Sequence, residues 1–209
     1  MKPHSPDGNA APSAWVRRWS HLVPAGAEVL DVACGGGRHL RWFAALGARV
    51  VGIDRDDSAF AALRADLGDR VELLRADIEA GPWPWPHRRF GAVVVVNYLW
   101  RPLLPLLAAS VEAGGVLIHE TFARGNETVG RPSNPDFLLA PGELLAAAQA
   151  GGLRVVAYED GFLADPSPRH VQRIAAVREL AARAVPRYPL KGEPPSGPTV
   201  NSGPLKDPA

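Results

Sequence analysis

The sequence is short of cysteine, of net charge and of long apolar runs, and each shortage excludes a class of protein. A single cysteine, Cys34, rules out an internal disulfide and fits a reducing compartment. The formal net charge of +1 gives no strong field for nucleic acid or an anionic membrane. Apolar runs such as Ala92 to Val96 have the length of a strand and are far too short to span a bilayer. Met1 to Ser13 has no apolar core and so does not read as a signal peptide, and we expect a cytoplasmic protein with no membrane partner.

What the sequence does contain is the composition of an ordinary globular domain. Its 209 residues are 46% hydrophobic and 22% charged, which is enough chain and apolar content for one sizeable core. We expect residues 1–12 to be flexible and residues 13–185 to form the folded domain. Residues 186–209 are rich in Pro, Gly and Lys and are expected to be mostly disordered.

The most informative stretch runs from Glu28 to Leu46. The apolar run from Glu28 to Val32 predicts a short buried strand, and residues 38–46 carry apolar side chains at helical spacing. The glycines between them permit a tight turn and let the backbone approach a ligand closely. Strand, glycine turn and helix N-terminus together indicate a nucleotide-binding element at the carboxyl edge of a parallel sheet. The alternative is a plain glycine-rich turn, because short glycine motifs also match by chance.

Two common nucleotide motifs do not fit this stretch. A dinucleotide fingerprint needs a third glycine where Leu40 stands, and a P-loop needs a Lys followed by Ser or Thr where Arg38 and His39 stand. Elsewhere, apolar strand patterns alternate with helical ones, which predicts an α/β doubly wound domain. The further expected strands are 48–53, 71–75, 90–96, 112–122, 153–160 and 171–177, and the further expected helices are 14–22, 58–67, 103–111 and 141–151.

Asp31, Gly35 and Gly37 fit the pattern acidic-x-x-x-Gly-x-Gly, and with it the chain resembles class I S-adenosylmethionine (SAM)-dependent methyltransferases. It resembles in particular the small bacterial type related to tellurite-resistance methyltransferases, although Ala33 stands where many members have glycine. The resemblance covers nearly all of residues 13–177. It implies a Rossmann-like seven-stranded sheet with helices on both faces and the last strand antiparallel. It also implies SAM as the cofactor and S-adenosylhomocysteine (SAH) as its product.

The resemblance assigns cofactor contacts to particular residues. Asp31 would lie near the methionine amino group, and Asp54, about twenty residues past the glycine turn, would accept bonds from the ribose hydroxyls. Asp77 would approach the adenine amino group while Ile78 packs on the ring. Without the resemblance, Asp54 is a helix-capping aspartate and Asp77 a turn aspartate. The full implied set is Asp31, Ala33, Cys34, Gly35, Gly37, Arg38, Asp54, Arg55, Asp77, Ile78 and Asn97.

Candidates for the methyl-transfer end follow the central strand, because ligands of doubly wound sheets lie beyond the carboxyl ends of the strands. Tyr98 and Arg101 come directly after Asn97 in this position, and we predict both as catalytic. His119, near the carboxyl edge of the fifth strand, is the third candidate, with a hydrogen-bonded core histidine as the alternative. Which face of the sheet His119 and Glu120 point to stays open, since strand side chains alternate.

Neither a cysteine nucleophile nor a metal is expected. Cys34 lies in the glycine turn with no obvious base beside it, so a packing role fits better. Residues 123–138 form a long polar loop, which we expect to open and close over the site. Its Arg124 and Arg131 are predicted to bind a small anionic acceptor. The alternative is a solvated surface loop whose arginines bind nothing.

The predicted reaction is transfer of the SAM methyl group by in-line displacement to a small acceptor, namely a thiol, a chalcogen oxyanion or a small metabolite. Because the donor is already activated, the protein mainly supplies positioning and desolvation. A non-catalytic SAM-binding sensor or partner subunit, and a methyltransferase acting on protein or RNA, are the alternatives. No Asn-Pro-Pro-Tyr-like tetrapeptide follows Val96, and we do not expect nucleic acid as a partner. The expected state is a monomer or homodimer.

Overall fold

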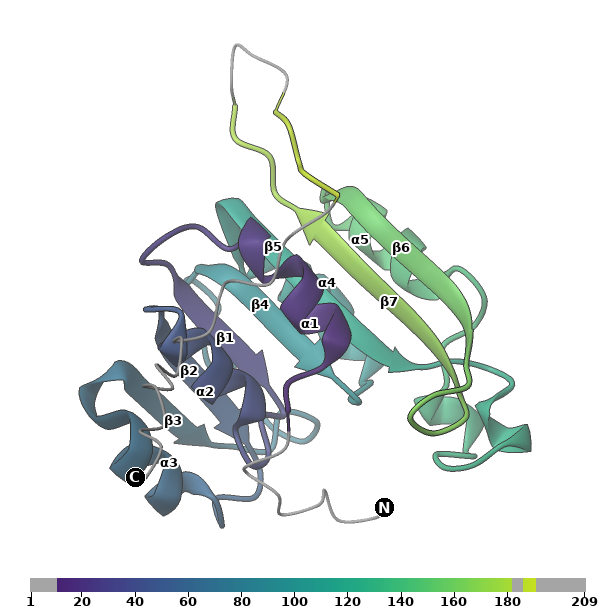
Figure 1. Cartoon of the computed structure of the whole chain (residues 1–209), viewed down its shortest axis with the longest axis horizontal. Coiled ribbons are helices and arrows are strands. Elements are labelled where there is room, and N and C mark those ends of the chain that lie inside the picture. Colours follow the sequence, from purple (N-terminus) through teal and green to yellow (C-terminus); the bar gives the residue numbers. More distant parts are fainter. Residues whose placement is uncertain (1–10, 182–185, 191–209) are drawn as a thin grey trace, which may run out of the picture.

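A computed structural model describes residues 11–181 and 186–190, and within them the chain forms one seven-stranded sheet covered by helices (Figure 1). The strand order is β3-β2-β1-β4-β5-β7-β6, with neighbours among β1 to β5 parallel and β7 antiparallel to both β5 and β6. The order therefore reverses between β1 and β4, which is where doubly wound sheets bind ligands. The strands are β1 (Glu28–Val32), β2 (Arg49–Asp54), β3 (Val71–Arg75), β4 (Phe90–Val96), β5 (Val111–Phe122), β6 (Arg154–Leu163) and β7 (Arg169–Val177).

Five α-helices lie on the two faces of the sheet in the described ranges. Those on one face pack through Trp15, Phe43 and Leu63, and those on the other through Leu107 and Leu144. Figure 1 shows α1 and α2 crossing in front of the strands and α4 and α5 behind them. Because helices cover both faces, the central strand β4 is buried along its whole length, and this explains its unbroken apolar run. The helices are α1 (Ala14–Trp19), α2 (Arg38–Ala45), α3 (Phe60–Leu67), α4 (Leu104–Ala109) and α5 (Glu143–Ala150).

The doubly wound fold, the seven strands and the antiparallel end of the sheet are confirmed. Three predicted strands have the observed bounds: Glu28–Val32, Val71–Arg75 and Phe90–Val96. The helix predicted at residues 103–111 is shorter, because a 3-10 turn (Arg101–Leu103) precedes it and β5 already begins at Val111. The predicted strand 153–160 continues to Leu163, since β6 and β7 pair along nearly their full lengths.

The chain ends fall largely outside the described residues. The predictions of a flexible segment at 1–12 and a disordered tail at 186–209 therefore concern mostly undescribed chain. In the described piece 186–190, Arg154 lies over the Tyr188 ring at 5.7 Å, and the His21 imidazole is 2.9 Å from the Pro189 carbonyl oxygen. Over the described ranges, no helix has both the length and the apolar character needed to cross a membrane.

Candidate cofactor and acceptor site

The turn between β1 and α2 has a backbone that only small residues adopt easily. Ala33, Gly35 and Gly37 all have positive φ, at 56°, 50° and 76°. A Cβ on Gly37 would lie 2.3 Å from a methyl carbon of Leu63 on α3, so a larger residue here would force the Leu63 side chain to move. The Gly37 N–H donates to the Cys34 carbonyl at 2.9 Å and closes the turn, and α2 begins at the next residue.

Cys34 is buried within this turn, next to two carboxylates. Its side chain is buried, and that burial, together with the carboxylates of Asp31 and Asp54, raises the pKa of the thiol well above its usual value. The thiol therefore stays protonated at neutral pH, as the packing role predicted for it requires.

Asp54 ties the end of β2 to the glycine turn. One carboxylate oxygen accepts the Gly35 N–H at 2.8 Å, and the other accepts the Asp56 N–H at 2.9 Å. A carboxylate offers about four lone-pair sites, so two remain for further donors. The geometry thus shows a turn-anchoring role for Asp54 and leaves room for the predicted ribose contact.

Asp31 has a buried carboxylate oxygen that accepts no hydrogen bond within the described residues. The residue is 1% exposed on β1, and its Oδ2 has no hydrogen-bond partner among the described residues. The nearest cation-capable group is His39 Nδ1 at 3.7 Å, which is beyond hydrogen-bonding distance. His39 itself is held by the Ser13 N–H, which donates to Nε2 at 3.3 Å. A buried, unpaired carboxylate oxygen is costly and suits a ligand cation.

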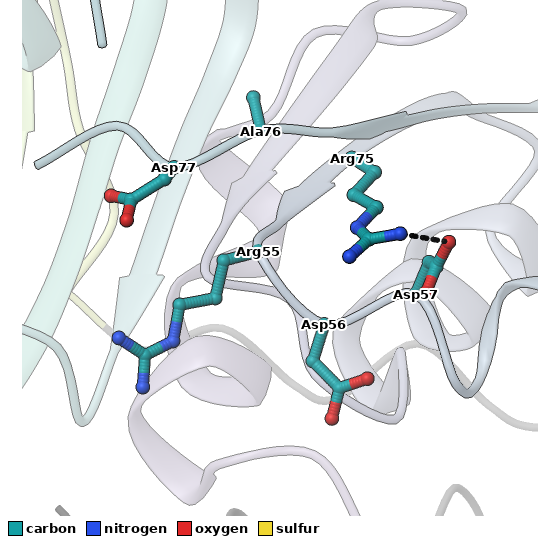
Figure 2. Close-up of a pocket in the computed structure, with 6 residues that line it drawn as sticks. All are labelled: Arg55, Asp56, Asp57, Arg75, Ala76 and Asp77. Carbon is teal, nitrogen blue, oxygen red and sulfur yellow. Dashed lines mark hydrogen bonds and ion pairs between the residues drawn. The ribbon is translucent and has the colours of Figure 1, made fainter. Parts of the chain in front are cut away.

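A hollow of about 610 Å³ opens beyond the carboxyl ends of β2 and β3 (Figure 2). Arg75 points across it toward Asp57, with 3.4 Å between the guanidinium nitrogen and the carboxylate oxygen. Asp77 Oδ1 accepts the Glu79 and Ala80 N–H groups at 2.9 and 3.2 Å. These bonds are those of a turn aspartate, the alternative that the sequence left open for this residue. Its other oxygen takes no part in those bonds. The lining residues are Arg55, Asp56, Asp57, Arg75, Ala76 and Asp77, and the predicted ring-packing residue Ile78 follows them, 8% exposed.

Beyond the end of β4 the chain makes a strained turn. Asn97 is exposed and has φ of 57°, a left-handed value that is uncommon for a residue other than glycine. Tyr98 is half-buried, and its hydroxyl has no hydrogen-bond partner within the described chain. Burial and the nearby Glu79 carboxylate raise the pKa of this phenol. At neutral pH, Tyr98 can therefore donate a hydrogen bond but is a poor base.

The two residues near the end of β5 point to opposite faces of the sheet, which answers a question the sequence left open. His119 is 1% exposed, its Nε2 lies 3.2 Å from the Tyr98 carbonyl oxygen, and burial lowers its pKa to about 4. Glu120 faces α1, where its carboxylate accepts the Ser13 hydroxyl at 3.2 Å with Arg173 at 3.7 Å. His119 therefore matches the core-histidine alternative.

Arg101 is engaged in structural contacts that do not favour the catalytic role predicted for it. Its guanidinium holds both oxygens of Glu143 on α5, at 2.7 and 3.0 Å. It also donates to the carbonyls of Asp136 and Leu138, at 2.7 and 2.8 Å. Arg101 thus fixes one end of the 123–138 loop to the body of the domain.

The loop at 123–138 is attached to the domain through its own side chains. Asn126 is 1% exposed, donates to the Pro132 carbonyl at 3.0 Å and accepts the His170 N–H at 3.2 Å. Arg124 and Arg131, predicted to bind an acceptor, are exposed on this loop. The loop lies beside the β6–β7 turn (Figure 1), and its opening and closing over the site stays a prediction.

Several residues of the site have no signal in the sequence that pointed to them. Ser13 reads as a helix cap, and it does cap α1, yet it also bridges His39 and Glu120. Asn126 resembles any polar loop residue, because its partners Pro132 and His170 are set by tertiary packing. The one sequence feature that could have indicated Asn126 is the unusual density of polar residues after β5.

The comparisons with known proteins agree with this geometry. Residues 29–113 match the model of a family described as a methyltransferase domain. The ribosomal RNA small subunit methyltransferase A of Anaeromyxobacter sp. (strain K) is 40% identical over 73 residues, covering 35% of this chain and 26% of the relative. The chain thus spans about a quarter of the length of that curated relative.

Solved structures extend the likeness to most of the domain. TehB from Haemophilus influenzae aligns with a TM-score of 0.62 and 17% identity, covering 77% of this chain and 60% of TehB. The 1,6-didemethyltoxoflavin-N1-methyltransferase of Burkholderia thailandensis aligns with a TM-score of 0.60 and 18% identity, covering 79% and 76%. Residues 29–113 thus resemble a methyltransferase domain, and the chain shares the fold of these solved structures.

Proposed function

We propose that the chain binds SAM at the β1–α2 turn and transfers its methyl group to a small acceptor. The observation that carries this is the unpaired, buried Oδ2 of Asp31 beside the glycine turn. An ammonium group is the natural partner for such an oxygen, and SAM carries one on its methionine part. The Burkholderia thailandensis neighbour, solved with bound S-adenosylhomocysteine, supports the same choice of cofactor.

The remaining cofactor contacts follow the strand ends. Asp54 has lone pairs left for ribose hydroxyls, and the hollow between Arg55 and Asp77 has room for the adenine. Ile78 would pack against that ring. Ala33, Cys34, Gly35, Gly37 and Arg38 would lie along the amino-acid and sugar part, with Asn97 at the methyl end. When bound, SAM supplies a sulfonium methyl group that an acceptor attacks in line, leaving a neutral thioether.

The candidate catalytic side chains favour an acceptor that needs little help from a base. His119 donates through Nε2, the Tyr98 phenol stays protonated, and Arg101 is fully occupied as a clamp. A thiol loses its proton easily, and a chalcogen oxyanion carries none on the attacking atom, so neither needs much help from a base. An oxygen or nitrogen acceptor needs a general base. The RNA methyltransferase among the relatives keeps RNA open as an alternative acceptor.

The cofactor is tested by thermal unfolding. SAM and SAH are expected to raise the melting temperature, because a ligand that binds only the folded state stabilises it by mass action. NAD is the control, since the turn lacks the third glycine of a dinucleotide site. Stabilisation by NAD and none by SAM would contradict the proposal. A transfer assay with labelled SAM over a panel of thiols and oxyanions then separates an enzyme from a SAM-binding sensor.

The acceptor side is tested by replacing Arg124 and Arg131 with alanine together. Both are exposed on the 123–138 loop, on the acceptor side of the proposed site, so we expect SAH affinity within about twofold of the parent. Turnover on an anionic acceptor is expected to fall at least tenfold, because charge-assisted bonds to the acceptor are lost. Equal turnover in the parent and the double variant would return these arginines to the solvated surface.

A further inference from the structure

We infer that His119 is a positioning residue, whose Nε2–H donor fixes the Asn97–Tyr98 turn at the end of the central strand. This inference rests on the proposed function, because it is that turn which would present the methyl-transfer end of the site. It goes further by giving the buried histidine a task that is neither acid–base chemistry nor simple packing.

The turn needs an external hold because its backbone is strained. Asn97 has φ of 57°, a left-handed conformation that asparagine adopts more readily than most L-residues but that still costs energy relative to an extended backbone. Such conformations persist only where the surrounding structure over-determines them, and they gather at ligand sites. Asn97 is also exposed at the switch point between β1 and β4, so a ligand can reach it.

The hold comes from two consecutive residues of β5. The Asn97 N–H donates to the Glu120 carbonyl oxygen at 2.9 Å, and His119 Nε2 lies 3.2 Å from the Tyr98 carbonyl oxygen. A carbonyl only accepts, so Nε2 must carry the hydrogen. The backbone on both sides of the Asn97–Tyr98 peptide is therefore bonded to the neighbouring strand.

His119 is not placed to act as a base. Its Nε2 proton is committed to the Tyr98 carbonyl, and Nδ1 is buried with no hydrogen-bond partner in the described part of the chain. Burial keeps the ring neutral, with a pKa lowered to about 4, so the donor is present throughout the neutral range. Since His119 is 1% exposed, an acceptor cannot reach it without displacing other groups.

The same strand secures the opposite side of the site. Glu120, on the other face, accepts the hydroxyl of Ser13, whose own N–H donates to His39 beside Asp31. Adjacent β5 residues thus hold the β4 turn on one face and the start of α1 on the other. This arrangement gives both buried polar residues, His119 and Glu120, a partner outside β5.

Two amides of different length test the inference. In His119→Gln the side-chain NH₂ can reach the position of Nε2, whereas in His119→Asn it lies near the position of Nδ1. Hydrogen exchange of the backbone amides of residues 97–99 is measured in the free protein, and SAH affinity by calorimetry. His119→Asn and His119→Ala are expected to speed exchange at least tenfold and weaken SAH binding about tenfold. His119→Gln is expected to stay within about threefold of the parent in both.

The outcomes separate this inference from the proposed function. If Gln and Asn behave alike, whether both fail or both match the parent, the position of the donor does not matter and the inference is wrong. A Gln variant that does not fold also overturns it, because a donor at Nε2 should suffice. If only the Asn variant fails to fold, His119→Ala provides the donor-free comparison for exchange and affinity. If the parent binds no SAH, the proposed function fails, and the exchange data, which need no ligand, still decide the role of His119.

Discussion

Replacing Asp54 with alanine is expected to weaken the binding of SAM and SAH roughly ten- to a hundredfold. A hydrogen bond to a charged group contributes on the order of 1.5–3 kcal/mol, and about 1.4 kcal/mol corresponds to a tenfold change in affinity. The Asp54 carboxylate also holds the Gly35 N–H at 2.8 Å, so its removal loosens the glycine turn as well. We therefore expect the loss to lie toward the upper end of the range.

Asp54→Asn and Asp69→Ala refine this test. Asn keeps one carbonyl oxygen and can retain one of the two backbone bonds, so its affinity should lie between those of the parent and Asp54→Ala. Asp69 is exposed in the 3-10 turn before β3, and its removal changes the net charge by the same amount. Calorimetry with SAH measures all three variants. An unchanged dissociation constant for Asp54→Ala would leave this residue with only its turn-anchoring role.

The parts of the fold that the sequence predicted are those with a local cause. The unbroken apolar run at residues 90–96 follows from burial on both faces, and the observed β4 has those bounds. The start of α1 follows from the Ser13 side chain, which accepts from the Trp15 and Val16 N–H groups as an N-cap does. Glycine spacing placed the turn between β1 and α2, because positive φ is a property of single residues.

The parts that the sequence did not predict depend on partners far along the chain. Arg101 looks like a free cation after the central strand, but Glu143, 42 residues away, takes its guanidinium. His119 looks like a base at the sheet edge, but the 21-residue separation from Tyr98 hides the bond that orients it. Residue type and spacing show which groups are near the carboxyl edge. They do not show which of those groups are already bonded to another part of the protein.

Replacing Asn126 with alanine is expected to destabilise the protein by roughly 2–4 kcal/mol. The change leaves the Pro132 carbonyl and the His170 N–H without their partner; both bonds are part-buried, and an unsatisfied group costs about 1–3 kcal/mol when fully buried, so the loss should lie toward the lower end of the range. The 123–138 loop would lose its side-chain bond to β7 and keep the backbone bond from Ala123 to His170, so the amides around residue 126 should exchange faster. SAH affinity should stay within about twofold, because the loop lies on the acceptor side of the proposed site.

Asn134→Ala in the same loop provides the matched control. Asn134 is exposed, and its side chain accepts only the Asp136 N–H, at 3.0 Å, as the cap of a 3-10 turn. Its replacement is expected to cost no more than about 1 kcal/mol, as is usual for capping residues. Denaturant unfolding measures both variants, and hydrogen exchange follows residues 123–138. If the two variants lose equal stability and equal protection, Asn126 does not anchor the loop. The Arg101 bonds to the Asp136 and Leu138 carbonyls and the backbone bond from Ala123 to His170 would then be the contacts that hold the loop.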